Sequence, residues 1–197
     1  MAKRLVLLVV LVLALPATAF AASVKVRVEG KTKTLFAPTA ITITASTPME
    51  AIEQASLLGE LYYHVTTTSF GPYVDQVGRY GGTQSSGWVF KVNGSSPPVG
   101  ADQVTLKDGD DVLWYYADFG PTGGPPTLFV KSVPGGCYLV AALDDNAKSA
   151  SVSDLQWHVG SKQTVAGAVG KQFCPKKHTG LLVRATATDA VRSNAVR

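Results

Sequence analysis

Residues 87–116 read GWVFKVNGSSPPVGADQVTLKDGDDVLWYY, and this stretch decides the fold of the first half of the chain. Hydrophobic residues alternate through 87–92, as in a β-strand with two different faces. Asn93-Gly94 is typical of a tight hairpin turn. The Asp- and Gly-rich residues 107–110 predict a second turn between short strands at 104–106 and 111–116. The stretch therefore predicts a small sheet.

The residues before this stretch add two strands and one helix. Valines at 24, 26 and 28 alternate with charged residues, and 35–44 continues with alternating Ile and Thr, so both segments predict strands. Thr47-Pro48-Met49-Glu50 predicts a helix start with a capping box, and the helix ends near Gly59. Residues 62–68 predict a strand, and 71–73 a loop. One helix against a small mixed sheet is an α+β arrangement.

A Gly- and Pro-rich linker at 120–126 separates the second half of the chain. Its strand-like segments are divided by Gly, Asp, Asn and Pro clusters, which is typical of an all-β fold. These segments are 128–133, 138–143, 155–159, 163–165 and 180–188. We expect a small β-sandwich over 127–197.

Residues 1–21 have the composition of a cleavable secretory signal peptide. Lys3 and Arg4 precede an apolar run, and both Ala17-Thr18-Ala19 and Ala19-Phe20-Ala21 offer small residues for cleavage, with a cut after Ala21 preferred. The sequence predicts no membrane span in the mature chain, so we expect a protein that is secreted or held in the cell envelope. In that setting Cys137 and Cys174 predict a disulfide, with metal binding as the alternative.

The charge of the chain changes sign between its halves. Residues 22–120 carry seven Lys/Arg and ten Asp/Glu, a balance of −3, and residues 126–197 carry nine and four, a balance of +5. The basic half predicts either a solvated surface or attraction to an anionic cell-surface polymer. The basic residues are scattered and the aromatic-rich half is acidic, which argues against nucleic-acid binding.

Four motifs in the first half resemble those of the DUF4430 family. They are Gly71-Pro72-Tyr73-Val74, the segment 87–94, Val99-Gly100-Ala101-Asp102 and the segment 106–116. The resemblance covers about residues 24–118 and implies a β-grasp-like domain at 22–119 of a secreted bacterial protein. The family is similar to the C-terminal domain of transcobalamin and intrinsic factor, which covers one face of cobalamin. The resemblance therefore implies cobalamin or corrinoid binding as an alternative function, although no helical domain supplies the other face here. The second half loosely resembles bacterial immunoglobulin-like modules, in 182–188 and 192–194.

Motifs for nucleophilic, zinc-dependent or nucleotide chemistry do not occur in the sequence. We expect structural roles for His64, His158 and His178. The alternative is a hydrolase built around His64 or His158. Asp108-Gly109-Asp110-Asp111 predicts a turn rather than a calcium loop, because it lacks the ligand spacing of an EF-hand. Glu50, Glu53 and Glu60 predict a solvated helix face. No catalytic residue, metal site or cofactor is predicted.

Aromatic residues are the candidate ligand-binding groups of the first half. They are Tyr73, Trp88, Trp114, Tyr115 and Tyr116. On an open sheet face they would form a platform for a sugar, a peptide or a flat ligand. The alternative is that they border the core or pack on the second half. The sequence thus predicts an exported, non-catalytic protein that binds a ligand or partner which the sequence does not identify.

Overall fold

The computed structural model describes residues 21–120, 123–161, 163–176 and 179–197. Nearly all of the expected signal peptide, part of the linker and His178 lie outside these ranges. The described residues are mostly β-structure, with one helix and several small sheets. No helix within them is long and apolar enough to cross a membrane.

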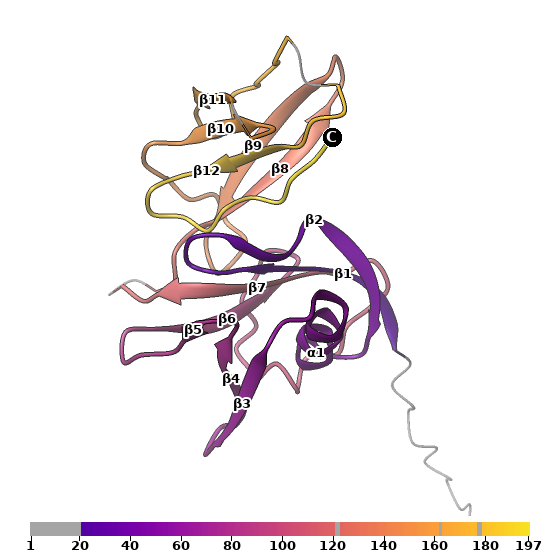
Figure 1. Cartoon of the computed structure of the whole chain (residues 1–197). Coiled ribbons are helices and arrows are strands. Elements are labelled where there is room, and N and C mark those ends of the chain that lie inside the picture. Colours follow the sequence, from indigo (N-terminus) through magenta and orange to yellow (C-terminus); the bar gives the residue numbers. More distant parts are fainter. Residues whose placement is uncertain (1–20, 121–122, 162, 177–178) are drawn as a thin grey trace, which may run out of the picture.

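A four-stranded sheet forms the centre of the N-terminal half, in the order β2-β1-β7-β6. β1 pairs antiparallel with β2 and parallel with β7, and β6 pairs antiparallel with β7. The helix α1 lies on one side of this sheet and the C-terminal half on the other (Figure 1). The elements are β1 (Ala22–Glu29), β2 (Thr34–Ala45), α1 (Pro48–Gly59), β6 (Ser86–Val92) and β7 (Asp111–Asp118).

The helix begins as the sequence predicts, with one change in its capping contacts. The Thr47 hydroxyl accepts a hydrogen bond from the Glu50 amide at 3.1 Å. The Glu50 carboxylate accepts from the amide of Ser46 at 2.7 Å and from its hydroxyl, one residue before the usual partner of a capping box. Ala51, Ile52 and Ala55 are buried on the valine-rich face of β1.

A second small sheet extends from the first, in the order β3-β4-β5. It consists of β3 (Tyr63–Thr68), β4 (Gly71–Val77) and β5 (Tyr80–Gly81). The expected loop at 71–73 is wrong, because β4 already begins at Gly71. Pro72 is tolerated there because β5 pairs only with Gln76 and Val77, which leaves the second edge of β4 open beside Pro72.

The expected strand at 104–106 is also wrong, because this segment joins no sheet. Leu106 is buried in the main core and its amide donates a hydrogen bond to the Ser46 carbonyl at 2.9 Å. The segment is therefore held by one buried side chain and one backbone contact, without a neighbouring strand. Hydrophobic residues alone do not distinguish this arrangement from a short strand.

The C-terminal half contains two sheets that share one hydrophobic core around the buried Trp157. The two-stranded sheet is β8 (Thr127–Val133) with β9 (Cys137–Leu143), and the three-stranded sheet has the order β11-β10-β12. The strands of the latter are β10 (Gln156–Val159), β11 (Gln163–Ala166) and β12 (Val183–Thr186), so the last strand is shorter than expected.

The predicted disulfide between Cys137 and Cys174 is confirmed. It ties the segment before β12 to the start of β9, where Tyr138 and Phe173 exchange backbone hydrogen bonds of 2.8 and 2.9 Å. The ring of Phe173 stacks on Trp157, with ring centroids 4.9 Å apart. The crosslink thereby holds an irregular segment against the core of this half.

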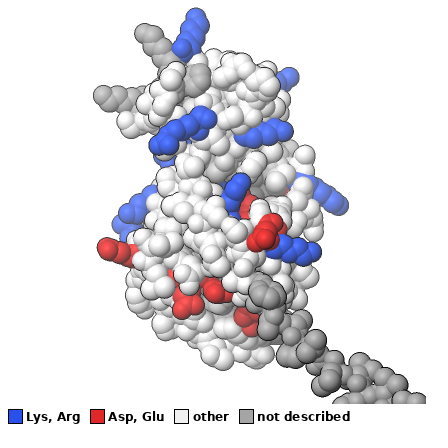
Figure 2. Space-filling view, turned by 90° about the vertical axis from the view of Figure 1, so that its right-hand side faces the viewer, with Lys and Arg blue, Asp and Glu red and all other residues white. Residues whose placement is uncertain are grey.

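Figure 2 shows the change in charge along the molecule. On this face the uppermost side chains with a charge are Lys and Arg, and the Asp and Glu side chains in view gather in the lower part, over the N-terminal half. On this face the Lys and Arg side chains stand apart from one another rather than in one dense patch.

Candidate functional site

The outer face of the four-stranded sheet is covered by the C-terminal half. Leu113, Tyr115 and Ala117 of β7 form a buried cluster with Val191, and Val89 packs against it. Trp88 and Trp114 lie on the other side of the sheet, in the core beneath α1. Among the described residues, the aromatic side chains of this sheet therefore form no open platform: they border the core or pack against the C-terminal half.

Lys91 joins the two halves from the same outer face. Its side chain is fully buried, and its ammonium group donates hydrogen bonds to the carbonyl of Asp144 at 2.9 Å and the hydroxyl of Thr127 at 3.3 Å. It also lies 3.3 Å from a carboxylate oxygen of Asp145. Burial lowers the pKa of Lys91, and the carboxylate of Asp145 opposes that shift.

A second buried contact between the halves centres on Glu29. Its carboxylate lies 2.7 Å from Arg27 Nη1 and 3.0 Å from Arg192 Nε. The Thr34 hydroxyl donates to both carboxylate oxygens, and Arg192 also donates to the carbonyl of Gly30. A fully buried carboxylate needs several such partners, because an unpaired charge inside a protein is strongly destabilising. The contacts fix the end of the chain on the first strand.

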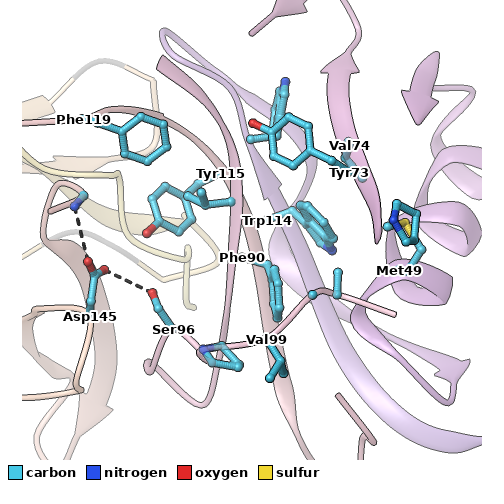
Figure 3. A pocket seen from close by; sticks show the side chains of 17 residues that line it. Met49, Tyr73, Val74, Phe90, Ser96, Val99, Trp114, Tyr115, Phe119 and Asp145 are labelled. Atoms are coloured by element: carbon cyan, nitrogen blue, oxygen red, sulfur yellow. Dashed lines mark hydrogen bonds between the residues drawn. The ribbon is translucent and has the colours of Figure 1, made fainter. Parts of the chain in front are cut away.

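An apolar pocket of about 330 Å³ opens beside the edge strand β6. β4 borders it on one side, and the loop of residues 96–101 borders it on the other. In Figure 3 the rings of Phe90, Trp114 and Tyr115 face this space, with Tyr73 and Phe119 beside them. The pocket thus reaches the edge of the aromatic core, where Phe90 is partly exposed and Trp114 and Tyr115 are 1% exposed.

The rim of the pocket carries exposed apolar side chains. Tyr73 is 37% exposed, Phe119 44% and Val99 46%. Three such side chains around an apolar pocket differ from the scattered hydrophobic residues of an ordinary surface.

Polar groups occur at the end of the pocket where the halves meet. The Asp145 carboxylate accepts hydrogen bonds from the Ser96 hydroxyl at 3.1 Å and the Gly124 amide at 3.3 Å (Figure 3). The Tyr115 hydroxyl points toward these groups. Burial raises the pKa of Tyr115, and the negative charge of Asp145 adds to that effect. Like any tyrosine, Tyr115 carries its proton at neutral pH and can donate a hydrogen bond.

Tyr73 is positioned by the backbone of β6. Burial raises the pKa of Tyr73, and a hydrogen bond with the backbone of Trp88 partly opposes this effect. A Cβ at Gly87 would collide with the Tyr73 hydroxyl. The absence of a side chain at position 87 therefore lets the phenol ring lie against β6.

Four of the five predicted ligand-binding residues line this pocket: Tyr73, Trp88, Trp114 and Tyr115. Tyr116 lies elsewhere. Its hydroxyl contacts the Ser86 hydroxyl at 2.9 Å and donates to the carbonyl of Gly81 at 3.0 Å. Ligand binding by the five residues stays a prediction.

Several lining residues were not among the predicted site residues. Two of them, Phe119 and Val99, lie in Gly- and Pro-rich segments. An apolar side chain in such a loop segment is a signal in the sequence that could have indicated a binding site. Asp145 lies in the other half of the chain and reaches the pocket only through the contact between the halves. No local pattern in the sequence indicates that contact.

The described histidines lie outside the pocket. His64 Nδ1 lies 2.7 Å from the Asp75 carboxylate, and His158 contacts the hydroxyls of Thr186 and Thr164 at 2.8 and 3.4 Å. One imidazole thus has a carboxylate partner and the other has hydroxyl partners. Neither has both kinds among the described residues, which is the combination that a triad requires.

The acidic turn at 107–110 is held by hydrogen bonds within the turn and from two neighbouring segments. Asp110 accepts from the Lys107 amide at 2.8 Å and from the Asn93 side chain at 2.7 Å, and Asp108 accepts from the Ser23 amide at 2.7 Å. Within the part of the chain that the structure describes, no three His, Cys, Asp or Glu side chains come close enough to hold a metal ion.

Comparison with protein families finds a match in the N-terminal half. Residues 46–118 match the model of DUF4430, described as a domain of unknown function. Haptocorrin in complex with Cbi resembles 52% of this chain at 18% identity and a TM-score of 0.44, and the chain covers about a quarter of haptocorrin (26%).

A candidate metal-binding protein from Ruminococcus gnavus ATCC 29149 resembles 50% of this chain at 16% identity and a TM-score of 0.39, and 99% of that protein is covered. A search of curated proteins finds no match. The match to DUF4430 starts at residue 46 rather than 24 and ends at residue 118 as expected. The resemblance predicted from the four motifs is therefore confirmed: residues 46–118 match DUF4430.

Proposed function

We propose that this chain is an exported, non-catalytic binding protein whose ligand occupies the pocket beside β6. The observation that carries the proposal is the pocket itself, where exposed Tyr73, Val99 and Phe119 surround an opening onto buried aromatic rings. Binding sites for small ligands are concave, mostly apolar and equipped with a few polar groups. The hydroxyl of Tyr115 and the carboxylate of Asp145 are such groups here.

The rest of the fold supports a rigid binding site rather than a reactive one. The disulfide suits an oxidising environment outside the cytoplasm. A β-grasp-like N-terminal half would supply the pocket, and a sandwich-like C-terminal half would brace it. The buried contacts of Lys91 and Glu29 hold the two halves together, so the pocket is largely pre-formed.

The volume of the pocket limits what it can hold. At about 330 Å³ it lies at the lower end of the range for ligand sites, which suits one aromatic or branched group. Cobalamin binding would place only a part of so large a ligand in this pocket. A titration that follows the absorption spectrum of cobalamin tests this alternative directly.

The proposal is tested by titrating the labelled protein with p-cresol and indole at millimolar concentration. Binding is followed by NMR chemical shifts of the pocket residues. Phe119→Ser removes a rim side chain that is 44% exposed, and Leu181→Ser removes one with the same exposure in the C-terminal half. We expect saturable shifts at Phe90 and Val99 that Phe119→Ser weakens and Leu181→Ser leaves unchanged. Equal effects of the two variants, or no saturable shift at all, would overturn the proposal.

A further inference from the structure

The edge of β6 that faces the pocket has a defined backbone pattern. In an antiparallel pair, opposite residues alternate between those that exchange hydrogen bonds and those that do not. The Asn93 amide donates to the Asp111 carbonyl at 2.9 Å, and the Phe119 amide donates to the Ser85 carbonyl at 2.8 Å. Odd-numbered residues of β6 therefore bond to β7, and even-numbered residues direct their amides and carbonyls away from it.

Both ends of this outward edge are already occupied. The Val92 amide donates to the Ser95 carbonyl at 2.8 Å, which closes the hairpin turn. At the other end the Ser86 carbonyl accepts from the Thr83 amide at 2.7 Å. The Tyr73 hydroxyl takes the next position, through its hydrogen bond with the backbone of Trp88.

Phe90 stands in the middle of the edge, between these occupied positions. Its opposite residue is Trp114, in a pair that exchanges no hydrogen bonds across the two strands. Within the described ranges, no residue hydrogen-bonds to the amide or the carbonyl of Phe90. Phe90 lines the pocket, so this donor and this acceptor lie next to an apolar cavity. These two groups are therefore free to bond to water or to a ligand that enters the pocket.

We propose, on the basis of the proposed function, that the ligand of this pocket is an extended peptide segment that pairs with β6. The peptide exchanges two hydrogen bonds with Phe90, as the next antiparallel strand of a sheet does. The open stretch lies between Trp88 and Val92, which leaves room for about three peptide residues at 3.4 Å each.

The side chains of the peptide follow from the same pairing. Residues directly opposite each other in an antiparallel pair point to the same face. The middle peptide side chain therefore lies beside the Phe90 ring, in the pocket between Tyr73 and Val99. An apolar or aromatic side chain suits this volume. A free aromatic ring would fill the cavity without supplying the donor and acceptor that the Phe90 amide and carbonyl match.

A blocked tripeptide, acetyl-Val-Phe-Val-amide, tests the inference with the full mature chain. Its control carries a methyl group on the middle amide nitrogen, which keeps the side chains and removes one hydrogen bond. The second measurement is hydrogen exchange at the Phe90 amide, with the amides of Val89 and Lys91 as internal references bonded to β7. In the free protein we expect Phe90 to exchange at least tenfold faster than both neighbours.

Saturating tripeptide should slow the exchange of Phe90 about tenfold or more, and the N-methylated peptide should bind at least tenfold more weakly. If both peptides bind equally and Phe90 stays unprotected, the pocket binds a side chain only, and strand pairing is wrong while the proposed function stands. If Phe90 is protected without peptide and light scattering gives a dimer, a second copy occupies the edge and the peptide is wrong. If neither the peptides nor p-cresol bind, the proposed function fails as well.

Discussion

Replacing Lys91 by Met tests whether the contact between the halves contributes to stability. The substitution keeps most of the side-chain volume and removes the ammonium group, which contacts Thr127, Asp144 and Asp145 within 3.3 Å. Removing one partner of a buried ion pair destabilises a protein by about 3–5 kcal/mol when the other partner is left alone. Asp145 is not left alone here, because its side chain is 36% exposed to water and keeps its hydrogen bonds from residues 96 and 124.

A second effect reduces the expected loss. Burial lowers the pKa of Lys91, so holding the ammonium group inside the protein has a cost that methionine does not carry. The net loss should be about 2 kcal/mol, smaller than the value for an isolated partner. The free energy of unfolding is measured by urea titration, with the fluorescence of the buried tryptophans as the signal.

Lys25→Met is the matched control, because Lys25 is exposed on β1. We expect a change within 0.5 kcal/mol for this control, as for most surface substitutions (roughly ±0.5 kcal/mol). If Lys91→Met is as stable as the parent protein or more stable, its buried contacts do not outweigh the cost of burying the charge, and the reasoning is refuted.

Three further changes probe other parts of the chain. Replacing both members of the Cys137–Cys174 pair by Ser should lower the free energy of unfolding by about 3–4 kcal/mol, measured in urea against the oxidised parent protein, because the crosslink closes a long loop. Glu50→Gln should cost about 0.5–1 kcal/mol at pH 7. Hydrogen bonds from Ser46 lower the pKa of Glu50 below 4.5, so this loss should be present above pH 4.5 and vanish in urea titrations as the pH falls through the lowered pKa. Gly87→Ala should displace Tyr73, weaken p-cresol binding in the NMR titration and destabilise the protein by about 1 kcal/mol; unchanged binding would show that the position of this phenol ring is unimportant.

Local patterns in the sequence predicted most elements of the fold. The alternation of valines at 24, 26 and 28 predicted a strand with one buried face, and Asn93-Gly94 predicted a turn, because both signals depend on residues that are near in the chain. The parallel pairing of β1 with β7 was not predicted, because that partner is distant in the sequence. The capping residues of the helix likewise predicted where it begins. Pro72 misled because a proline is tolerated in a strand with an open edge, and no local pattern reveals an open edge.

The candidate site was predicted only in part, for a reason that Tyr115 and Trp114 illustrate. Their alternation correctly places them on opposite faces of one strand, but alternation does not say what covers each face. The C-terminal half covers Tyr115, and Asp145 reaches the pocket through that same contact. Likewise, the free backbone of Phe90 depends on which strand stands at the edge of the sheet, and that order is set by contacts between distant segments.

The buried carboxylate of Glu29 makes it unfavourable for the N-terminal half to occur without the C-terminal half. One of its arginine partners, Arg27, lies on the same strand as Glu29. The other, Arg192, belongs to the C-terminal half. A gene fragment that carried only the first half into a new protein would expose this acid without its second arginine. Recombination should therefore move the halves together, or be accompanied by a neutral residue at position 29.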